Sequence, residues 1–156
     1  MKQPQFNLQQ AHRWFAVECN NHAWDLIEKS DRTADETDAM LHAAHASCHH
    51  WLQIGGELEH ARACTLLATA YHRAGFFERG MHFALRALAC LEEPGITPTP
   101  FDRACAHGAM AANCLLADRK PDAALHASAG GEAAAQCEES GERDLVEQLY
   151  PINHRA

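Results

Sequence analysis

The sequence predicts an all-α protein with a single domain. Alanine is abundant, valine is rare, and no segment alternates apolar and polar residues as a half-buried strand does. Apolar residues recur instead at helical spacing, in stretches that end at glycine, at proline or before a capping residue. We expect one domain over residues 1–156, which is long enough to bury a core without disulfide bonds.

The first four helices are predicted from their apolar stripes and their ends. The first carries apolar residues from Leu8 to Leu26 on one stripe, and His22 falls on the same stripe. The second begins with a capping box, because Glu36 follows Thr33 by three residues, and two glycines end it. The predicted bounds are about residues 7–29, 33–54, 57–74 and 77–93.

Glycine and proline mark the remaining boundaries. Gly75 stops the third helix, and the proline-rich segment 94–100 separates the fourth helix from the fifth, because no helix can cross it. Pro121 lies in the first turn of the sixth helix, where its missing N–H costs little, and Pro151 closes a short last helix. The predicted bounds are about residues 101–117, 121–139 and 144–150.

Small residues at regular positions predict how the third and fourth helices pack. Glycines and alanines are spaced so that two antiparallel helices can approach closely. This spacing resembles that of a tetratricopeptide (TPR) repeat, and an eroded copy follows in the fifth and sixth helices, where Met110 takes the place of Leu67. The positions that carry the resemblance are Leu67, Ala68, Tyr71, Gly75, Gly80, Ala84 and Ala87.

The resemblance implies three antiparallel hairpins, at about residues 7–54, 57–93 and 101–139, in a TPR-like right-handed superhelical array. The first hairpin follows the pattern poorly. The segment from Met40 to Trp51 and the hairpin after it are also similar to small uncharacterised bacterial helical-repeat proteins, which implies no known activity. The apolar ends of so short an array predict a homodimer.

The TPR resemblance also implies a binding groove. In TPR proteins the first helix of each hairpin lines the inner groove, which places Arg62, Thr65, Thr69, His72 and Arg73 there. Arginines, hydroxyls and an imidazole suit an acidic peptide or a carboxylate ligand. The function implied is that of a module that binds a protein or peptide. The alternative is that the two arginines are ordinary surface residues.

A cluster on the second helix suggests a different hypothesis. Asp38, His42, His45 and His49 fall within an arc of about 60° on one helical face. Imidazoles and a carboxylate side by side are what a divalent transition metal requires. The hypothesis is a metal-binding helical protein, a class that includes metalloenzymes. The alternative is that these residues form a solvated polar face.

Two further histidines lie on predicted apolar faces. His22 falls within the stripe of the first helix, and His60 shares a face with Cys64 and Leu67. Such histidines are usually hydrogen-bonded core residues, and the alternative is a ligand or general base in a pocket. Twelve histidines also raise a third hypothesis, a structural protein that responds to pH, because charging them below about pH 6.5 makes an acidic surface basic.

Composition argues against several functional classes. A net charge of −8 without a basic cluster disfavours a nucleic-acid binder. No apolar run reaches the length of a membrane span and no signal-peptide pattern opens the chain, so a cytoplasmic location is expected. No motif of a catalytic class is present, which disfavours an enzyme and any cofactor other than a metal. The seven cysteines are expected to be small thiols, mostly buried, in a reduced compartment.

Overall fold

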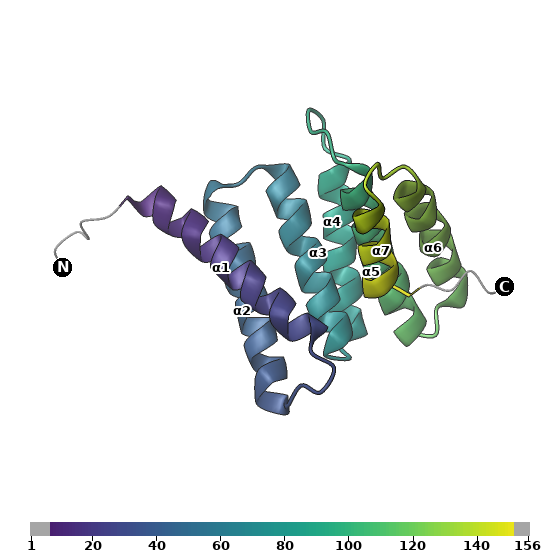
Figure 1. Cartoon of the computed structure of the whole chain (residues 1–156), viewed down its shortest axis with the longest axis horizontal. Coiled ribbons are helices and arrows are strands. Elements are labelled where there is room, and N and C mark those ends of the chain that lie inside the picture. The colour runs from purple at the N-terminus through teal and green to yellow at the C-terminus, as the bar shows by residue number, and fades with distance from the viewer. Residues whose placement is uncertain (1–6, 152–156) are drawn as a thin grey trace.

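The computed structural model describes residues 7–151, and every regular element within them is an α-helix (Figure 1). The helices are α1 (Leu8–Glu28), α2 (Ala34–Ile54), α3 (Glu57–Arg73), α4 (Phe77–Leu91), α5 (Pro100–Leu116), α6 (Lys120–Ala135) and α7 (Ser140–Leu149). The all-α prediction is confirmed for this part of the chain. The largest difference from the predicted bounds lies between α6 and α7, where the N–H groups of Gln136 and Cys137 bond carbonyls three residues back and turn the chain early.

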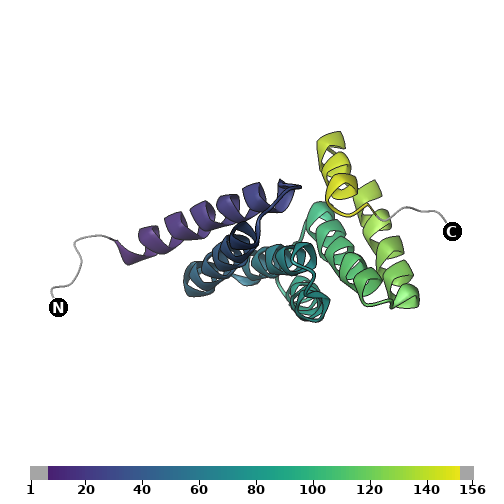
Figure 2. The same cartoon turned by 90° about the horizontal axis from the view of Figure 1, so that it is seen from below.

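Consecutive helices pack along one another, with α1 on α2, α3 on α4 and α5 on α6. α3 also contacts α2 and α5, and α4 contacts α5, so the pairs follow one another in a row (Figure 2). α7 packs on α5 and α6 at the far end of this row. The helices α1, α3, α5 and α7 contribute side chains to one shared hollow, which is described below.

A single buried amide joins three of the helices. Asn113 in α5 is 0% exposed, and its Nδ2 donates to the carbonyl oxygens of Ala68 in α3, at 3.1 Å, and of Ala109, at 2.9 Å. Gly80 in α4 lies against the same amide, and a Cβ at this position would overlap it. Glycine is therefore required at this place in the repeat pattern because the Asn113 side chain occupies the space that any larger residue needs.

The apolar stripe predicted for the first helix is out of phase with the buried face of α1. Ala16 and Ala23 are 0% exposed, whereas Phe15 is 44% exposed and His22 is exposed. Small residues allow α1 to approach α2, where the Ser47 hydroxyl donates to the carbonyl oxygen of Ala16 at 2.8 Å. The prediction that His22 is a core residue is wrong, because α1 turns its alanines toward α2, and of the predicted stripe Leu26 is buried while Phe15 and His22 stay outside.

We expect Gly80→Ala to lower the free energy of unfolding by about 2 kcal/mol, because the added methyl group displaces the Asn113 amide and this outweighs the gain in helix propensity. Urea denaturation followed by circular dichroism measures the change. Gly141→Ala in α7 is the matched control, since no atom lies within 4 Å of a Cβ at that position. Equal stability of the wild-type and Gly80→Ala chains would contradict the role given to Asn113.

Candidate functional site

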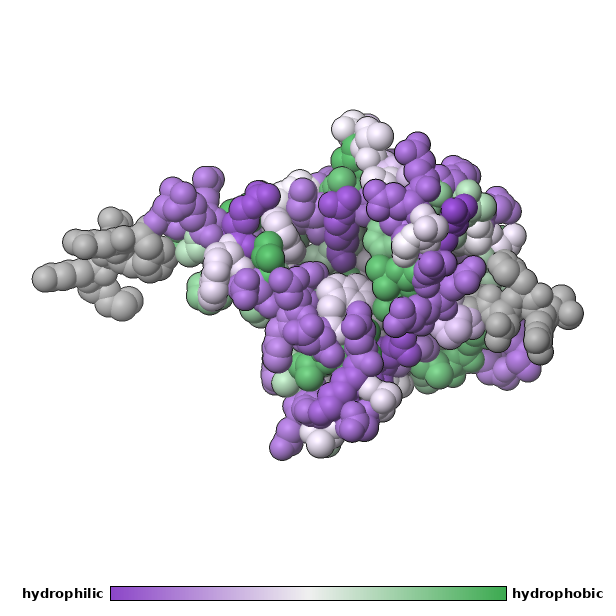
Figure 3. All heavy atoms as spheres, viewed as in Figure 1, coloured by the Kyte–Doolittle hydropathy of each residue, from purple (hydrophilic) through white to green (hydrophobic). Residues whose placement is uncertain are grey.

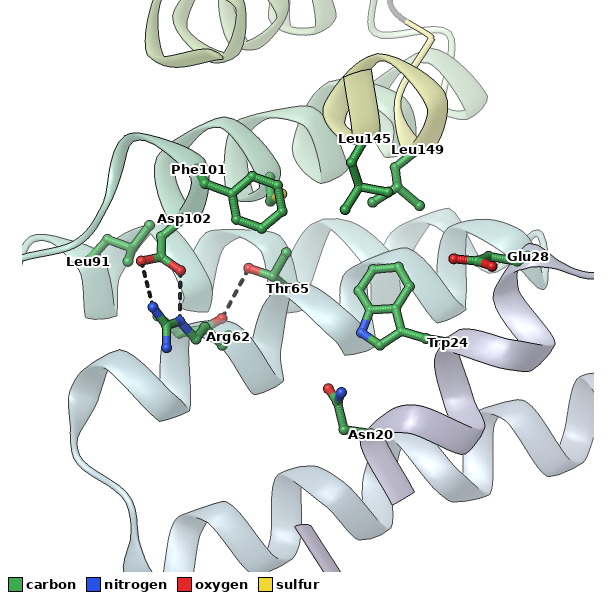
Figure 4. Close-up of a pocket in the computed structure, with 12 residues that line it drawn as sticks. Asn20, Trp24, Glu28, Arg62, Thr65, Leu91, Phe101, Asp102, Leu145 and Leu149 are labelled. Carbon is green, nitrogen blue, oxygen red and sulfur yellow. Dashed lines mark hydrogen bonds and ion pairs between the residues drawn. The ribbon is translucent and has the colours of Figure 1, made fainter. Parts of the chain in front are cut away.

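A pocket of about 470 Å³ opens where α1, α3, α5 and α7 face one another (Figure 4). Large apolar side chains form most of its wall: Trp24 from α1, Phe101 from α5, and Leu145 and Leu149 from α7. Leu91 at the end of α4 lies near Phe101. On the face of the molecule seen in Figure 3, apolar residues are visible beside α7 between more hydrophilic surfaces. A concave, apolar hollow between helices is the usual form of a ligand or peptide site.

The position of α7 depends on Thr69 and Arg73 of α3 and on Tyr150, which follows α7. Tyr150 is 3% exposed, and its hydroxyl lies 2.7 Å from the Oγ1 of Thr69 in α3. Its ring covers Gly108 of α5, where a Cβ would come within 2.6 Å of the ring. Arg73 donates to the carbonyl oxygen of Leu149 at 3.1 Å. Burial raises the pKa of Tyr150, so the phenol stays neutral, and these contacts hold the end of α7 against α3 and α5.

An ion pair lies at the end of the pocket near Leu91. The Arg62 guanidinium donates to Asp102 through Nε at 2.7 Å and through Nη2 at 3.1 Å. Asp102 also accepts hydrogen bonds from the backbone N–H and the hydroxyl of Thr99, which caps α5. Burial raises the pKa of Asp102, but the hydrogen bonds from Arg62 and Thr99 outweigh it, and the net pKa lies below its usual value. Asp102 is therefore charged at neutral pH.

The pocket is lined by one cationic and two anionic side chains. The side chain of Arg62 is 54% exposed and that of Asp102 only 5%, so the pair presents its cationic half to solvent. Glu28 at the opposite end is the other charged residue among those that line the pocket. Arg62 is paired with Asp102, and with Glu28 at the other end the pocket carries no excess of positive charge.

Two of the five residues expected in the groove line this pocket, namely Arg62 and Thr65. Thr69 is 0% exposed and bonds Tyr150, and Arg73 bonds the end of α7. His72 is partly buried, does not line the pocket, and has an Nδ1 without a hydrogen-bond partner among the described residues. The reason is that Tyr150 and the end of α7 occupy the surface of α3 at Thr69 and Arg73, which the arrangement predicted from the sequence leaves open.

The apolar walls of the pocket did not appear among the residues expected from the sequence. Trp24 belongs to the first helix, where the repeat pattern is poor and gives no groove positions. Leu145 and Leu149 are spaced by four residues in α7, which is a helical signal, but nothing local indicates which surface this helix covers.

The histidine cluster of α2 is not assembled as a ligand set. Asp38, His42, His45 and His49 are all exposed, and His45 places its Nε2 2.8 Å from the Tyr71 hydroxyl. Burial, followed by nearby positive charge, lowers the pKa of His45. Within residues 7–151, no three His, Cys, Asp or Glu side chains are arranged to hold a metal ion.

The chain matches no protein family, no curated protein and no solved structure. Among the described residues, no helix has both the length and the apolar character needed to cross a bilayer. The functional proposal therefore depends on the geometry of the pocket.

Acid should weaken the fold through His72. Burial, with a smaller contribution from Arg73, lowers the pKa of His72 to about 4. The unfolded chain then binds more protons than the folded chain below about pH 6.5, so the contribution of His72 to stability falls as pH falls. Between pH 7 and pH 4.5 we expect this group to account for a loss of about 2 kcal/mol in the free energy of unfolding.

Urea denaturation of wild type and His72→Gln at both pH values isolates this effect. The variant should lose less stability on acidification than the wild-type chain. His22→Gln, at an exposed position of α1, is the control and should behave as wild type. An equal loss of unfolding free energy in the wild-type and His72→Gln chains would show that His72 does not cause the pH dependence.

Proposed function

We propose that the chain is a TPR-like interaction module, with three antiparallel hairpins in a right-handed superhelical array and a concave face that binds a peptide segment of a partner protein. The order of contacts between α3 and α5 supports this arrangement. Arg62 meets Asp102 near the start of both helices, and Ala68 meets Asn113 further along both. The two helices therefore run in the same direction, as the first helices of successive TPR hairpins do.

The turns after α3 and α5 support the same repeat. Gly75 has a φ of 81° and Asp118 has a φ of 55°, so the backbone adopts the left-handed conformation at the equivalent position of both turns. In each turn the next N–H bonds a carbonyl five residues back. This is a helix-ending motif that glycine favours, and the eroded copy keeps it with an aspartate.

The pocket carries the proposal about the occupant. Its walls are apolar, and Asp102 already accepts two hydrogen bonds from Arg62. We therefore propose a peptide that inserts large apolar side chains between Trp24 and the leucines of α7. The acidic peptide expected from the sequence is less favoured, because Asp102 and Glu28 oppose a further negative charge.

Selection of peptides from a random display library on the immobilised full chain tests the proposal. We expect enriched peptides with two or more large apolar residues. Trp24→Ala and Phe101→Ala should each weaken the binding of a selected peptide by about tenfold or more, because anchors in a closed pocket carry most of the binding energy. Leu125→Ala, in α6 at a residue that is 66% exposed and outside the pocket, should change the affinity less than about twofold.

Circular dichroism and urea denaturation must show that each variant is folded before its affinity is compared. The absence of any enriched peptide, or equal affinities for wild type, Trp24→Ala and Phe101→Ala, would refute the proposed groove. Enrichment of acidic peptides whose binding weakens in salt and is lost in Arg62→Gln would identify the acidic ligand expected from the sequence instead.

A further inference from the structure

A second hollow, of about 350 Å³, lies between α2, α3 and α4 and shares no lining residue with the peptide pocket. Each of its three helices contributes one cysteine: Cys48 from α2, Cys64 from α3 and Cys90 from α4. All three thiols are free. The proposed peptide groove makes no use of these residues.

Two of the thiols line this hollow from helices that pack on each other, Cys48 from α2 and Cys64 from α3. Cys64 is 4% exposed, whereas Cys48 is partly exposed at the pocket. A negative charge is less costly on the more exposed sulfur, so the geometry favours a thiolate at Cys48 and a protonated thiol at Cys64.

The charges around the pair reinforce this assignment. A hydrogen bond with the Cys64 side chain lowers the pKa of Cys48, burial opposes this shift, and the Arg86 guanidinium on α4 lowers the pKa further. The same hydrogen bond and burial raise the pKa of Cys64. Burial, followed by a hydrogen bond to Glu57, raises the pKa of Cys90, so the third thiol stays protonated. The other titratable groups that line the hollow are His45 and His49 on α2 and His60 on α3.

We propose that Cys48 and Cys64 form a dithiol that reacts with hydroperoxides, in which Cys48 attacks and Cys64 resolves. The open hollow gives a small oxidant access to Cys48. The product is a disulfide that joins α2 to α3, and a low-molecular-weight thiol would reverse it by exchange.

The reaction balances in two steps. The Cys48 thiolate attacks one oxygen of the hydroperoxide, the O–O bond breaks, and the leaving oxygen takes up the proton that Cys48 released, which yields a sulfenic acid and an alcohol or water. The Cys64 sulfur then attacks the sulfenic sulfur. The S–O bond breaks, an S–S bond forms, and the hydroxyl leaves with the Cys64 proton as water. Two thiols are oxidised and one hydroperoxide is reduced.

Alkylation of the reduced wild-type chain with iodoacetamide tests the assignment of Cys48 without any substitution. Mass spectrometry of the digested protein gives a rate for each cysteine as a function of pH. We expect Cys48 to react fastest, and its rate to rise at lower pH than that of Cys90 in the same hollow or of Cys19 in α1. A rate at Cys48 no higher than that at Cys90 would overturn the proposal.

Hydrogen peroxide, added in equimolar amount to the reduced full chain, tests the disulfide. Digestion without reductant should yield a peptide that links Cys48 to Cys64, with a mass lower by two hydrogen atoms. The Cys64→Ser chain should accumulate a dimedone adduct at Cys48, and the Cys48→Ser chain should give none at Cys64. Cys90→Ser is the matched control and should still form the disulfide.

Other results would contradict the pair. A mixture of linkages among all seven cysteines, or a loss of the Cys48–Cys64 link in Cys90→Ser, would refute it. Circular dichroism of each variant shows whether it folds. Where Cys64→Ser fails to fold, the alkylation rates and the linked peptide of the wild-type chain still decide the question.

Discussion

The close approach of α3 and α5 is the constraint on which the rest of the structure depends. Three groups span the two helices: the ion pair of Arg62 with Asp102, the Asn113 amide, and the Tyr150 side chain, which lies over Gly108 and bonds α3. Each is buried at least in part, and a buried polar group that loses its partner costs about 1–3 kcal/mol. If α3 and α5 separated, all of these groups would lose their partners at once. The contacts therefore favour a single relative position of the two helices.

The same constraint shapes the first of the two hollows to which we assign functions. Because the end of α7 is held against α3 and α5, Leu145 and Leu149 lie opposite Trp24, and an apolar pocket remains between them. The thiol pair lies in a separate hollow, where α3 meets α2 instead of α5. α3 is the element that both sites share, so a disulfide between Cys48 and Cys64 would restrain the helix that contributes to the peptide groove.

Local structure could be predicted from the sequence because its signals are local. The capping box at Thr33 and the helix stop at Gly75 act within one turn, and both lie where the sequence indicated. Of the residues expected in a groove, only Arg62 and Thr65 line the pocket, because the far wall of the pocket comes from α7. The Tyr150 ring can pack on α5 only because residue 108 is a glycine. The two residues are far apart in the sequence, and no local pattern connects them. The buried face of α1 was predicted at Leu26 but missed at Ala16 and Ala23, because alanines carry little apolar signal.

Nuclear Overhauser spectroscopy on the chain in solution reports whether the Tyr150 ring lies over Gly108, as the docking of α7 requires. We expect strong cross-peaks between the ring protons of Tyr150 and the Hα protons of Gly108, together with helical chemical shifts for α7. An absence of these cross-peaks, with random-coil shifts for residues 140–149, would show that α7 is not docked and that the pocket does not exist as described.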